Sequence, residues 1–228
     1  MQATVHERSI SRIILLTGEA EAPALSGILR DHNPTLEVTV ATTMSALGEA
    51  GAGAGTRLLS FCSAIIVPGA WLAALPGPSY NFHPGPPERP GRYPSVFALY
   101  EDAKQFGVTV HEMRASVDSG PIVAAEWFDI PPGCDLQTLE EMTLTGLAVL
   151  FRSLAPLLAR TMAPLPRQSV AWRGRKTTKA DCDALCLTTP DMDPVEAARR
   201  RGATSSAAAD HARKCSPTTR TMAEKQYR

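Results

Sequence analysis

Apolar and polar residues follow two alternating patterns along the first 160 positions of the chain. Short apolar runs, of the length of buried strands, alternate with longer segments in which apolar residues recur every three or four positions, the period of an amphipathic helix. The short runs predict strands at residues 12–18, 36–42, 56–68, 79–84, 108–113 and 122–130. The longer segments predict helices at residues 19–33, 44–50, 70–77, 94–106 and 135–160, of which the third is short enough to be a turn.

Strands that alternate with helices in this way indicate one α/β domain, residues 10–160, on a mostly parallel sheet with helices on both faces. Pro94 fits the first turn of its helix, Gly107 the position just past that helix, and Asp135 the N-cap of the long last helix. Ligands of such sheets bind at the carboxyl ends of the strands. Functional residues are therefore expected in the loops that follow strands.

The rest of the chain changes in character. Residues 161–202 are polar, and basic at first, and they predict a short irregular extension with one helix from Pro194 to Arg201. Residues 203–228 hold almost no large apolar side chain, so we expect this tail to be disordered.

Overall charge gives no indication of a nucleic-acid or membrane partner, because 23 Lys and Arg balance 23 Asp and Glu. No apolar run reaches the ~20 residues of a membrane span, and the N-terminal residues do not resemble a signal peptide, so the expected location is cytoplasmic. The five cysteines are widely spread and are expected to be reduced. Cys182 and Cys186 can share a helical face, but no second ligand pair lies nearby in the sequence, and we expect no metal.

The clearest candidate for chemistry is the Asn-x-His pair at Asn81 and His83. Two residues apart on a strand, the two side chains share one face, with backbones about 6 to 7 Å apart. A proline-rich segment follows directly, and its fixed φ angles lower the entropy cost of holding a site open. A structural histidine is the alternative. The glycines of "GAGAG" (residues 51–55) predict only a surface turn, because a dinucleotide fingerprint would directly follow a strand and open a helix.

Asp118 lies in the loop "RASVDSGP" between the last two predicted strands. The loop can fold over the same edge of the sheet, so that the carboxylate would fix the tautomer of His83 and favour its protonated form. The alternative is that Asp118 caps a turn.

The sequence "NFHPG" (Asn81 to Gly85), followed in order by "PGRYPSVFAL", "GVTVHEM" and "VDSGPIV", resembles the folate-dependent formyltransferases. This family includes methionyl-tRNA, glycinamide-ribonucleotide and amino-sugar formyltransferases and formyltetrahydrofolate deformylase. The resemblance covers residues 12–158 and implies a Rossmann-like sheet, 10-formyltetrahydrofolate as the formyl donor, and a catalytic set of Asn81, His83 and Asp118. The extension resembles the linker that follows the catalytic domain in the tRNA and amino-sugar enzymes.

By this resemblance the pterin of the donor lies against main chain after the third strand and in the loop before Asp118. The acidic residues often found just before the aspartate of the family are replaced here by "RAS", which bears on cofactor affinity more than on catalysis. The implied cofactor residues are Ser63, Ala64, Ile65 and Val67 in the first segment and Ala115, Ser116 and Val117 in the second.

The implied reaction is attack of an amine on the formyl carbon. The Asn81 amide and a protonated His83 would stabilise the oxyanion, each such donor contributing about 3 to 4 kcal/mol. Asp118, directly or through a water, would take a proton from the attacking ammonium.

Two features of the sequence limit the class of formyl acceptor: the charge of the residues after the first strand and the length of the C-terminal extension. Glu19 and Glu21 follow the first strand, where a phosphate-binding loop would be needed for purine synthesis, and they would repel a phosphate. The extension is too short for a second, tRNA-binding domain. We expect a small-molecule amine, such as a nucleotide-linked amino sugar, with Arg89, Arg92 and Tyr93 as candidates to hold it.

Other interpretations stay open. Water as the acceptor would make the protein a deformylase, and a silent folate-binding module is a further alternative. The sequence also leaves homodimerisation open. Because related chains would continue into a structured element, we hypothesise that the tail derives from a frame change or from a truncated accessory domain.

Overall fold

In the computed structural model, residues 10–215 are described, with side chains to residue 204. Six strands form one sheet in the order β2-β1-β3-β4-β5-β6. The pairs β1–β2, β1–β3 and β3–β4 are parallel, whereas β4–β5 and β5–β6 are antiparallel. The strands are β1 (Arg12–Leu16), β2 (Glu37–Ala41), β3 (Thr56–Phe61), β4 (Tyr80–His83), β5 (Gln105–Glu112) and β6 (Ile122–Asp129).

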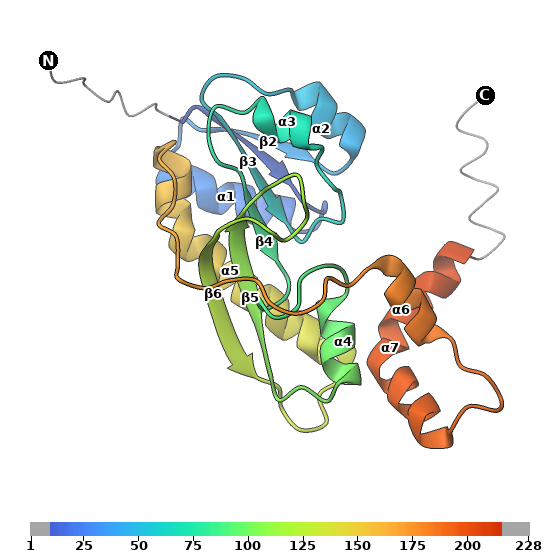
Figure 1. Cartoon of the computed structure of the whole chain (residues 1–228). Helices are drawn as coiled ribbons and strands as arrows, with labels where there is room; N and C mark the ends of the chain where they lie inside the picture. Colours follow the sequence, from blue (N-terminus) through green and yellow to red (C-terminus); the bar gives the residue numbers. More distant parts are fainter. Residues whose placement is uncertain (1–9, 216–228) are drawn as a thin grey trace, which may run out of the picture.

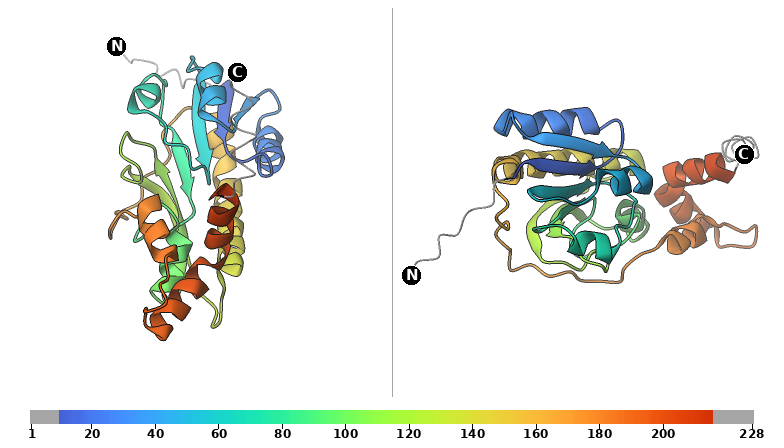
Figure 2. Two further views of the ribbon diagram at one scale, coloured as in Figure 1. Left: turned by 90° about the vertical axis from the view of Figure 1, so that its right-hand side faces the viewer. Right: turned by 90° about the horizontal axis from the view of Figure 1, so that it is seen from above.

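Helices cover both faces of the sheet, as predicted, and a small helical lobe follows them (Figures 1 and 2). α1 and α5 pack together on one face, while α2 and α3 cover the other. α5 is long and apolar enough to span a membrane by composition alone, but its apolar face is buried in the core of this fold. The helices are α1 (Ala22–His32), α2 (Met44–Ala50), α3 (Gly69–Ala73), α4 (Pro94–Tyr100), α5 (Leu136–Arg160), α6 (Lys179–Cys186) and α7 (Pro194–Cys215).

The continuous apolar runs of the sequence are explained by burial of the sheet on both faces. In β1, Ile13 and Leu15 pack toward α1 and α5, while Ile14 and Leu16 pack toward α2 and α3, and all four side chains are fully buried. An alternating polar pattern would have exposed one of these faces. β1 therefore lies inside the sheet, with the carboxyl ends of β1 and β3 at the same edge.

Two local predictions can be compared directly with the structure. Asp135 caps α5 as predicted, since its carboxylate accepts a hydrogen bond from the Thr138 N–H at 2.8 Å. Gly107 does not follow the end of α4; it lies inside β5, and the helix already ends at Tyr100. A side chain at Gly107 would collide with the Glu126 carbonyl on β6, so this glycine allows the close approach of two strands.

The segment after α5 does not leave the domain directly. Figure 2 shows it running back along the edge of the domain before it reaches α6 and α7. α7 begins at Pro194 as predicted but continues past Arg201 to Cys215, so the first part of the predicted tail is helical. The remainder of that tail, 216–228, lies outside the described residues.

Arg57 on β3 fixes the C-terminal end of α5, although it is fully buried. Its guanidinium donates to the carbonyls of Leu158, Thr161 and Ala163 beyond or near the helix end, and to Pro78. The Leu158 carbonyl lies in the last turn of α5, at the negative end of the helix dipole, which favours a cation there. Burial lowers the pKa of Arg57. Its hydrogen bonds to these carbonyls replace the lost hydration and stabilise the charged guanidinium inside the protein.

We predict that Arg57→Met lowers the free energy of unfolding by about 3 kcal/mol, because it leaves several carbonyl oxygens buried without a donor. Urea denaturation followed by circular dichroism measures the change. Arg152→Met, on the exposed side of α5, is the matched control and should change stability little. Equal losses in both variants would contradict this role of Arg57.

Candidate active site

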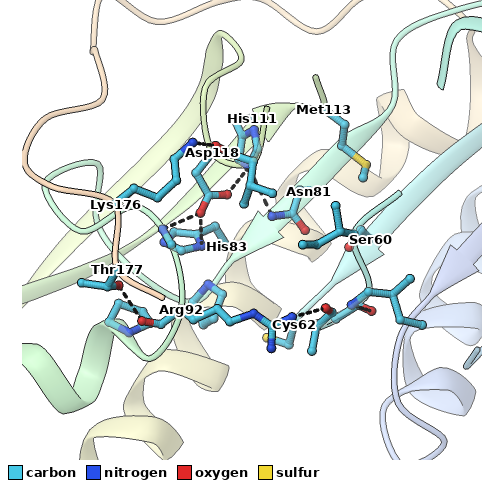
Figure 3. A pocket seen from close by; sticks show the side chains of 18 of the residues that line it. Ser60, Cys62, Asn81, His83, Arg92, His111, Met113, Asp118, Lys176 and Thr177 are labelled. Atoms are coloured by element: carbon cyan, nitrogen blue, oxygen red, sulfur yellow. Dashed lines mark hydrogen bonds and ion pairs between the residues drawn. The ribbon is translucent and has the colours of Figure 1, made fainter. Parts of the chain in front are cut away.

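A cavity of about 460 Å³ opens at the carboxyl ends of β3 and β4. Its floor is polar, and its walls are formed by the loop after β3, the proline-rich loop after β4, the loop before Asp118, and the segment that leads into α6. Figure 3 shows side chains from all of these segments directed to one region. The polar side chains of β4 and the residues after the third strand therefore share one cavity, as the sequence predicts for an α/β sheet.

Strand alternation places Asn81 and His83 on the cavity side of β4, while Tyr80 and Phe82 enter the apolar core on the other face. On the neighbouring strand, His111 lies directly opposite Asn81, and the Asn81 amide nitrogen is 3.2 Å from Nε2 of His111. The sequence reasoning missed His111. The alternation of Val108 and Val110 with Thr109 and His111 in the predicted strand already indicated that His111 lies on the face opposite the two valines.

Asp118 joins these groups. One carboxylate oxygen lies 3.2 Å from Nε2 of His111, and the other lies 3.5 Å from Nδ1 of His83. The second oxygen also accepts a hydrogen bond of 2.7 Å from the Gly91 N–H. Asp118 has φ of 44°, a left-handed conformation that aspartate tolerates better than most residues. The contact of Asp118 with His83 agrees with the sequence expectation; its contacts with His111 and Gly91 were not foreseen.

The remaining nitrogen of each imidazole faces a main-chain carbonyl. Nε2 of His83 lies 3.0 Å from the Arg89 oxygen, and Nδ1 of His111 lies 2.8 Å from the Glu112 oxygen. Since a carbonyl only accepts, both of these nitrogens carry hydrogen, and the other nitrogen of each ring can donate to Asp118 only when the ring is an imidazolium. The cluster is therefore built to hold a proton between two imidazoles and one carboxylate.

Asp118 is ionised at neutral pH. Burial alone would raise the pKa of this carboxyl, but the hydrogen bond from His111, the charges of His83 and His111 and the Gly91 N–H together lower the pKa to about 2. Asp118 is thus a weak proton acceptor and a strong electrostatic partner for an imidazolium.

His83 differs from expectation in its resting charge. Burial is the largest influence and lowers the pKa of His83; Asp118 and the Arg89 carbonyl oppose this but do not outweigh it. The carboxylate does favour the protonated form, as predicted, yet a ring that is only 3% exposed loses too much hydration for the charge to be its resting state. Burial therefore opposes the protonated form of His83 that the carboxylate favours.

The proline-rich loop reaches the site only because two positions lack a side chain. A Cβ at Gly85 would collide with the His83 ring and with Pro94, and Gly91 has φ of 100° and lies against the Thr177 main chain. The Thr109 hydroxyl donates to the Gly85 carbonyl at 2.8 Å, which ties the loop to β5. The loop is thus held to the sheet at its start and to the later chain at its end.

The predicted cofactor residues lie around the cavity with one exception. Ala115 instead lines a second hollow of about 370 Å³ beside α3. The first segment is apolar at Ile65 and Val67 and exposes main chain, a combination that suits an aromatic ring with polar edges. The residues that line the main cavity as predicted are Ser63, Ala64, Ile65, Val67, Ser116 and Val117.

Two of the three residues predicted to hold the acceptor line the cavity, and the third does not. Arg92 and Tyr93 line the cavity, and the Arg92 guanidinium donates to the Ala64 carbonyl at 2.7 Å. Arg89 does not line it. Its guanidinium lies 2.8 Å from the Glu101 carboxylate on the far side of the loop, while its main chain holds His83. Its side chain is therefore not placed to bind an acceptor.

The extension contributes a wall that the sequence did not predict. Lys176, Thr177, Thr178 and Lys179 line the cavity, and the ring of Trp172 packs edge-on against both histidines. The sequence holds one signal for this wall, the run of basic residues from Arg173 to Lys179, which a solvated linker explains equally well.

We predict that acid weakens the fold through this cluster. The pKa of Asp118 is lower in the folded than in the unfolded chain, so its stabilisation, about 2 kcal/mol, is present above about pH 4 and is lost as pH falls toward 2. The lowered pKa of His83 adds a loss that begins as pH falls below the ordinary histidine value. Urea denaturation between pH 7 and pH 2 measures both.

Asp118→Asn is the control, because it removes the carboxyl group whose protonation causes the loss of stability at the lower pH. If the variant lost stability between pH 4 and pH 2 as steeply as the unmodified protein, the carboxylate would not be the source.

Comparisons with known proteins agree with this geometry. Residues 51–147 match the family model described as formyl transferase. A phosphoribosylglycinamide formyltransferase of Mycobacterium tuberculosis is 33% identical over 110 residues, which cover 47% of this chain and 50% of the relative. A methionyl-tRNA formyltransferase of Enterococcus faecalis is 29% identical over 82 residues, covering 36% of this chain and 26% of that protein. The chain thus matches about half, or less, of the length of these curated relatives.

Solved structures share the fold over more of the chain. A sugar N-formyltransferase from Shewanella has a TM-score of 0.65 at 15% identity and covers 83% of this chain and 86% of its own. An N-formyltransferase from Helicobacter canadensis, solved with folinic acid and dTDP-3-aminofucose, has a TM-score of 0.64 at 13% identity and covers 85% and 80%. At these identities the likeness establishes the fold. The family match over residues 51–147 and the shared fold make this chain similar to the formyltransferases.

Proposed function

We propose that this protein transfers a formyl group from 10-formyltetrahydrofolate to an amine on a small molecule. The observation that carries the proposal is the convergence of the Asn81 amide with His83 and Asp118 at the floor of a cavity large enough for a folate head group. The donor would lie against the apolar main-chain segment at Ile65 and Val67. When bound, it supplies an activated formyl carbon.

Each residue of the cluster has a distinct part in this reaction. The nitrogen of the Asn81 amide, which lies 3.2 Å from Nε2 of His111, carries two N–H groups, and one of them would donate to a developing oxyanion. The Nε2–H of His83, satisfied here by the Arg89 carbonyl, is the second donor once it turns to the oxyanion. The proton that the attacking amine gives up is held at His83 as an imidazolium beside ionised Asp118, and is returned from there to the departing nitrogen.

We propose that the acceptor carries phosphate, as a nucleotide-linked amino sugar does. Cationic side chains gather at the cavity mouth, where Arg92, Lys176 and Lys179 line the wall. The end of β1 is different in sign, because the Glu21 carboxylate lies near enough to act electrostatically on Cys62, which lines the cavity there. A phosphate would be repelled at Glu21 and attracted at the mouth. This supports a nucleotide sugar over glycinamide ribonucleotide.

The decisive assay incubates the protein with 10-formyltetrahydrofolate and a panel of amines, including nucleotide-linked amino sugars, and follows release of tetrahydrofolate. We predict that His83→Ala and Asp118→Asn each lower kcat by at least about 100-fold, because each removes part of the proton and oxyanion machinery. His32→Ala on α1 is the matched control.

Other outcomes identify the alternatives. Formate released without any amine would indicate a deformylase. Binding of a folate without turnover would indicate a silent module, and full activity of His83→Ala would contradict the mechanism.

We predict that Lys179→Ala raises KM for a nucleotide-linked amino sugar about tenfold, a loss of about 1.4 kcal/mol, with kcat little changed. The reason is that the lysine would contact phosphate, far from the reacting atoms. Steady-state kinetics with the same sugar amine lacking phosphate should show no such rise. Lys104→Ala, an exposed lysine away from the cavity, is the control. A rise in KM for both sugars would contradict phosphate contact.

A further inference from the structure

Trp172 lies over the two histidines although it comes from the extension and not from the α/β domain. Its ring centroid is 5.5 Å from that of His83 and 5.0 Å from that of His111, and both pairs are nearly perpendicular, at 73° and 86°. Such edge-to-face contacts are favourable for aromatic rings. Trp172 thus touches both imidazoles that share Asp118.

This indole is held by a series of contacts along residues 172–178, which we call the strap. Its own Nε1–H donates to the Gly120 carbonyl at 2.9 Å, near the end of the Asp118 loop. Thr177 exchanges main-chain hydrogen bonds with Pro90 and Arg92, at 3.0 and 2.9 Å, and its hydroxyl bonds the Arg92 carbonyl at 2.6 Å. The part of the strap that follows Trp172 is therefore fixed to the proline-rich loop.

The Asp118 loop is fixed by the strap as well. The ammonium of Lys176 bonds the Ser116 hydroxyl at 3.2 Å and the Val117 carbonyl, directly before Asp118. Figure 3 shows Lys176 reaching across to this loop above His83. One short segment thus bridges the loop that carries Asp118 and the loop that follows His83.

Trp172 is not explained as a residue of the apolar core. Within the part of the chain whose side chains the structure describes, none of the four apolar clusters includes it. Its ring contacts in that part are the two histidines. A large indole placed against two titratable rings, and away from the core, excludes water from those rings.

We propose that Trp172 is a positioning residue, which keeps water from the His83–Asp118–His111 cluster and holds the two imidazoles in contact with one carboxylate. Its catalytic consequence rests on the formyl transfer proposed above. A dry cluster strengthens the electrostatic contact of an imidazolium with Asp118 and keeps water from competing with the amine for the formyl carbon. The extension then supplies part of the active site.

The direction of the expected change follows from the groups around His83. Burial is the main cause of its lowered pKa, while Asp118 and the Arg89 carbonyl raise it and His111 lowers it slightly. Lys176 on the strap and Arg92 on the proline-rich loop are the nearby permanent cations. Removing the indole readmits water, and the pKa of His83 should then rise.

The test is a pH titration by nuclear magnetic resonance of the full chain with labelled histidine, compared with Trp172→Ala and Trp172→Phe. The His83 signal is assigned by its loss in His83→Asn. We expect the His83 midpoint to move to higher pH in the alanine variant and to stay in place in the phenylalanine variant, which keeps an aromatic cover. Trp127→Ala, at an indole 45% exposed on β6, is the control. Trp172→Leu replaces the alanine variant if that variant does not fold.

Activity provides the second measurement. With 10-formyltetrahydrofolate and a reactive amine, Trp172→Ala should lower formyl transfer about tenfold and raise the share of formyl lost to water, where water attacks the formyl carbon and formate and tetrahydrofolate are released. Trp172→Phe should restore most of the transfer. An unchanged His83 midpoint and an unchanged share of formate in the alanine variant would overturn the proposal. A shifted midpoint in proteins that turn over no donor would instead reject the proposed function alone.

Discussion

The organisation of this active site depends on one carboxylate. Asp118 is buried, and a buried charge is tolerated only when hydrogen-bond donors surround it. Its partners come from three directions: the imidazoles of His83 on β4 and His111 on β5, and the Gly91 N–H in the proline-rich loop, which donates to it. The requirement to satisfy Asp118 therefore fixes two strands and two loops relative to one another, and the cavity is the space that they enclose.

The same constraint gives the proline-rich loop its function. The prolines limit the conformations of the loop, but they do not determine where it lies. Its position comes from the Thr109 hydroxyl at one end and from the strap at the other, where Thr177 pairs with Pro90 and Arg92. The extension is thus a structural component of the site, although the family match ends before it, at residue 147.

The sequence predicted the site unevenly, and the reasons are physical. Asn81 and His83 could be placed because a strand has a period of two, and Asp118 could be placed in a loop at the same edge of the sheet. His111 was open to the same reasoning on the next strand but has no neighbouring motif to mark it. Arg89 was assigned by its position in the loop, yet side-chain direction in a loop depends on partners such as Glu101, which no periodicity reveals.

By itself the sequence determined the α/β class, the order of most strands and helices, the cap at Asp135 and three residues of the buried polar cluster, because these follow from local periodicity and from short motifs. Only the tertiary structure decided that His111 shares Asp118, that burial outweighs the carboxylate in setting the charge of His83, and that Trp172 covers both rings. Each of these depends on groups far apart in the chain that meet in a place without water, where hydration is lost and paired charges and hydrogen bonds must replace it.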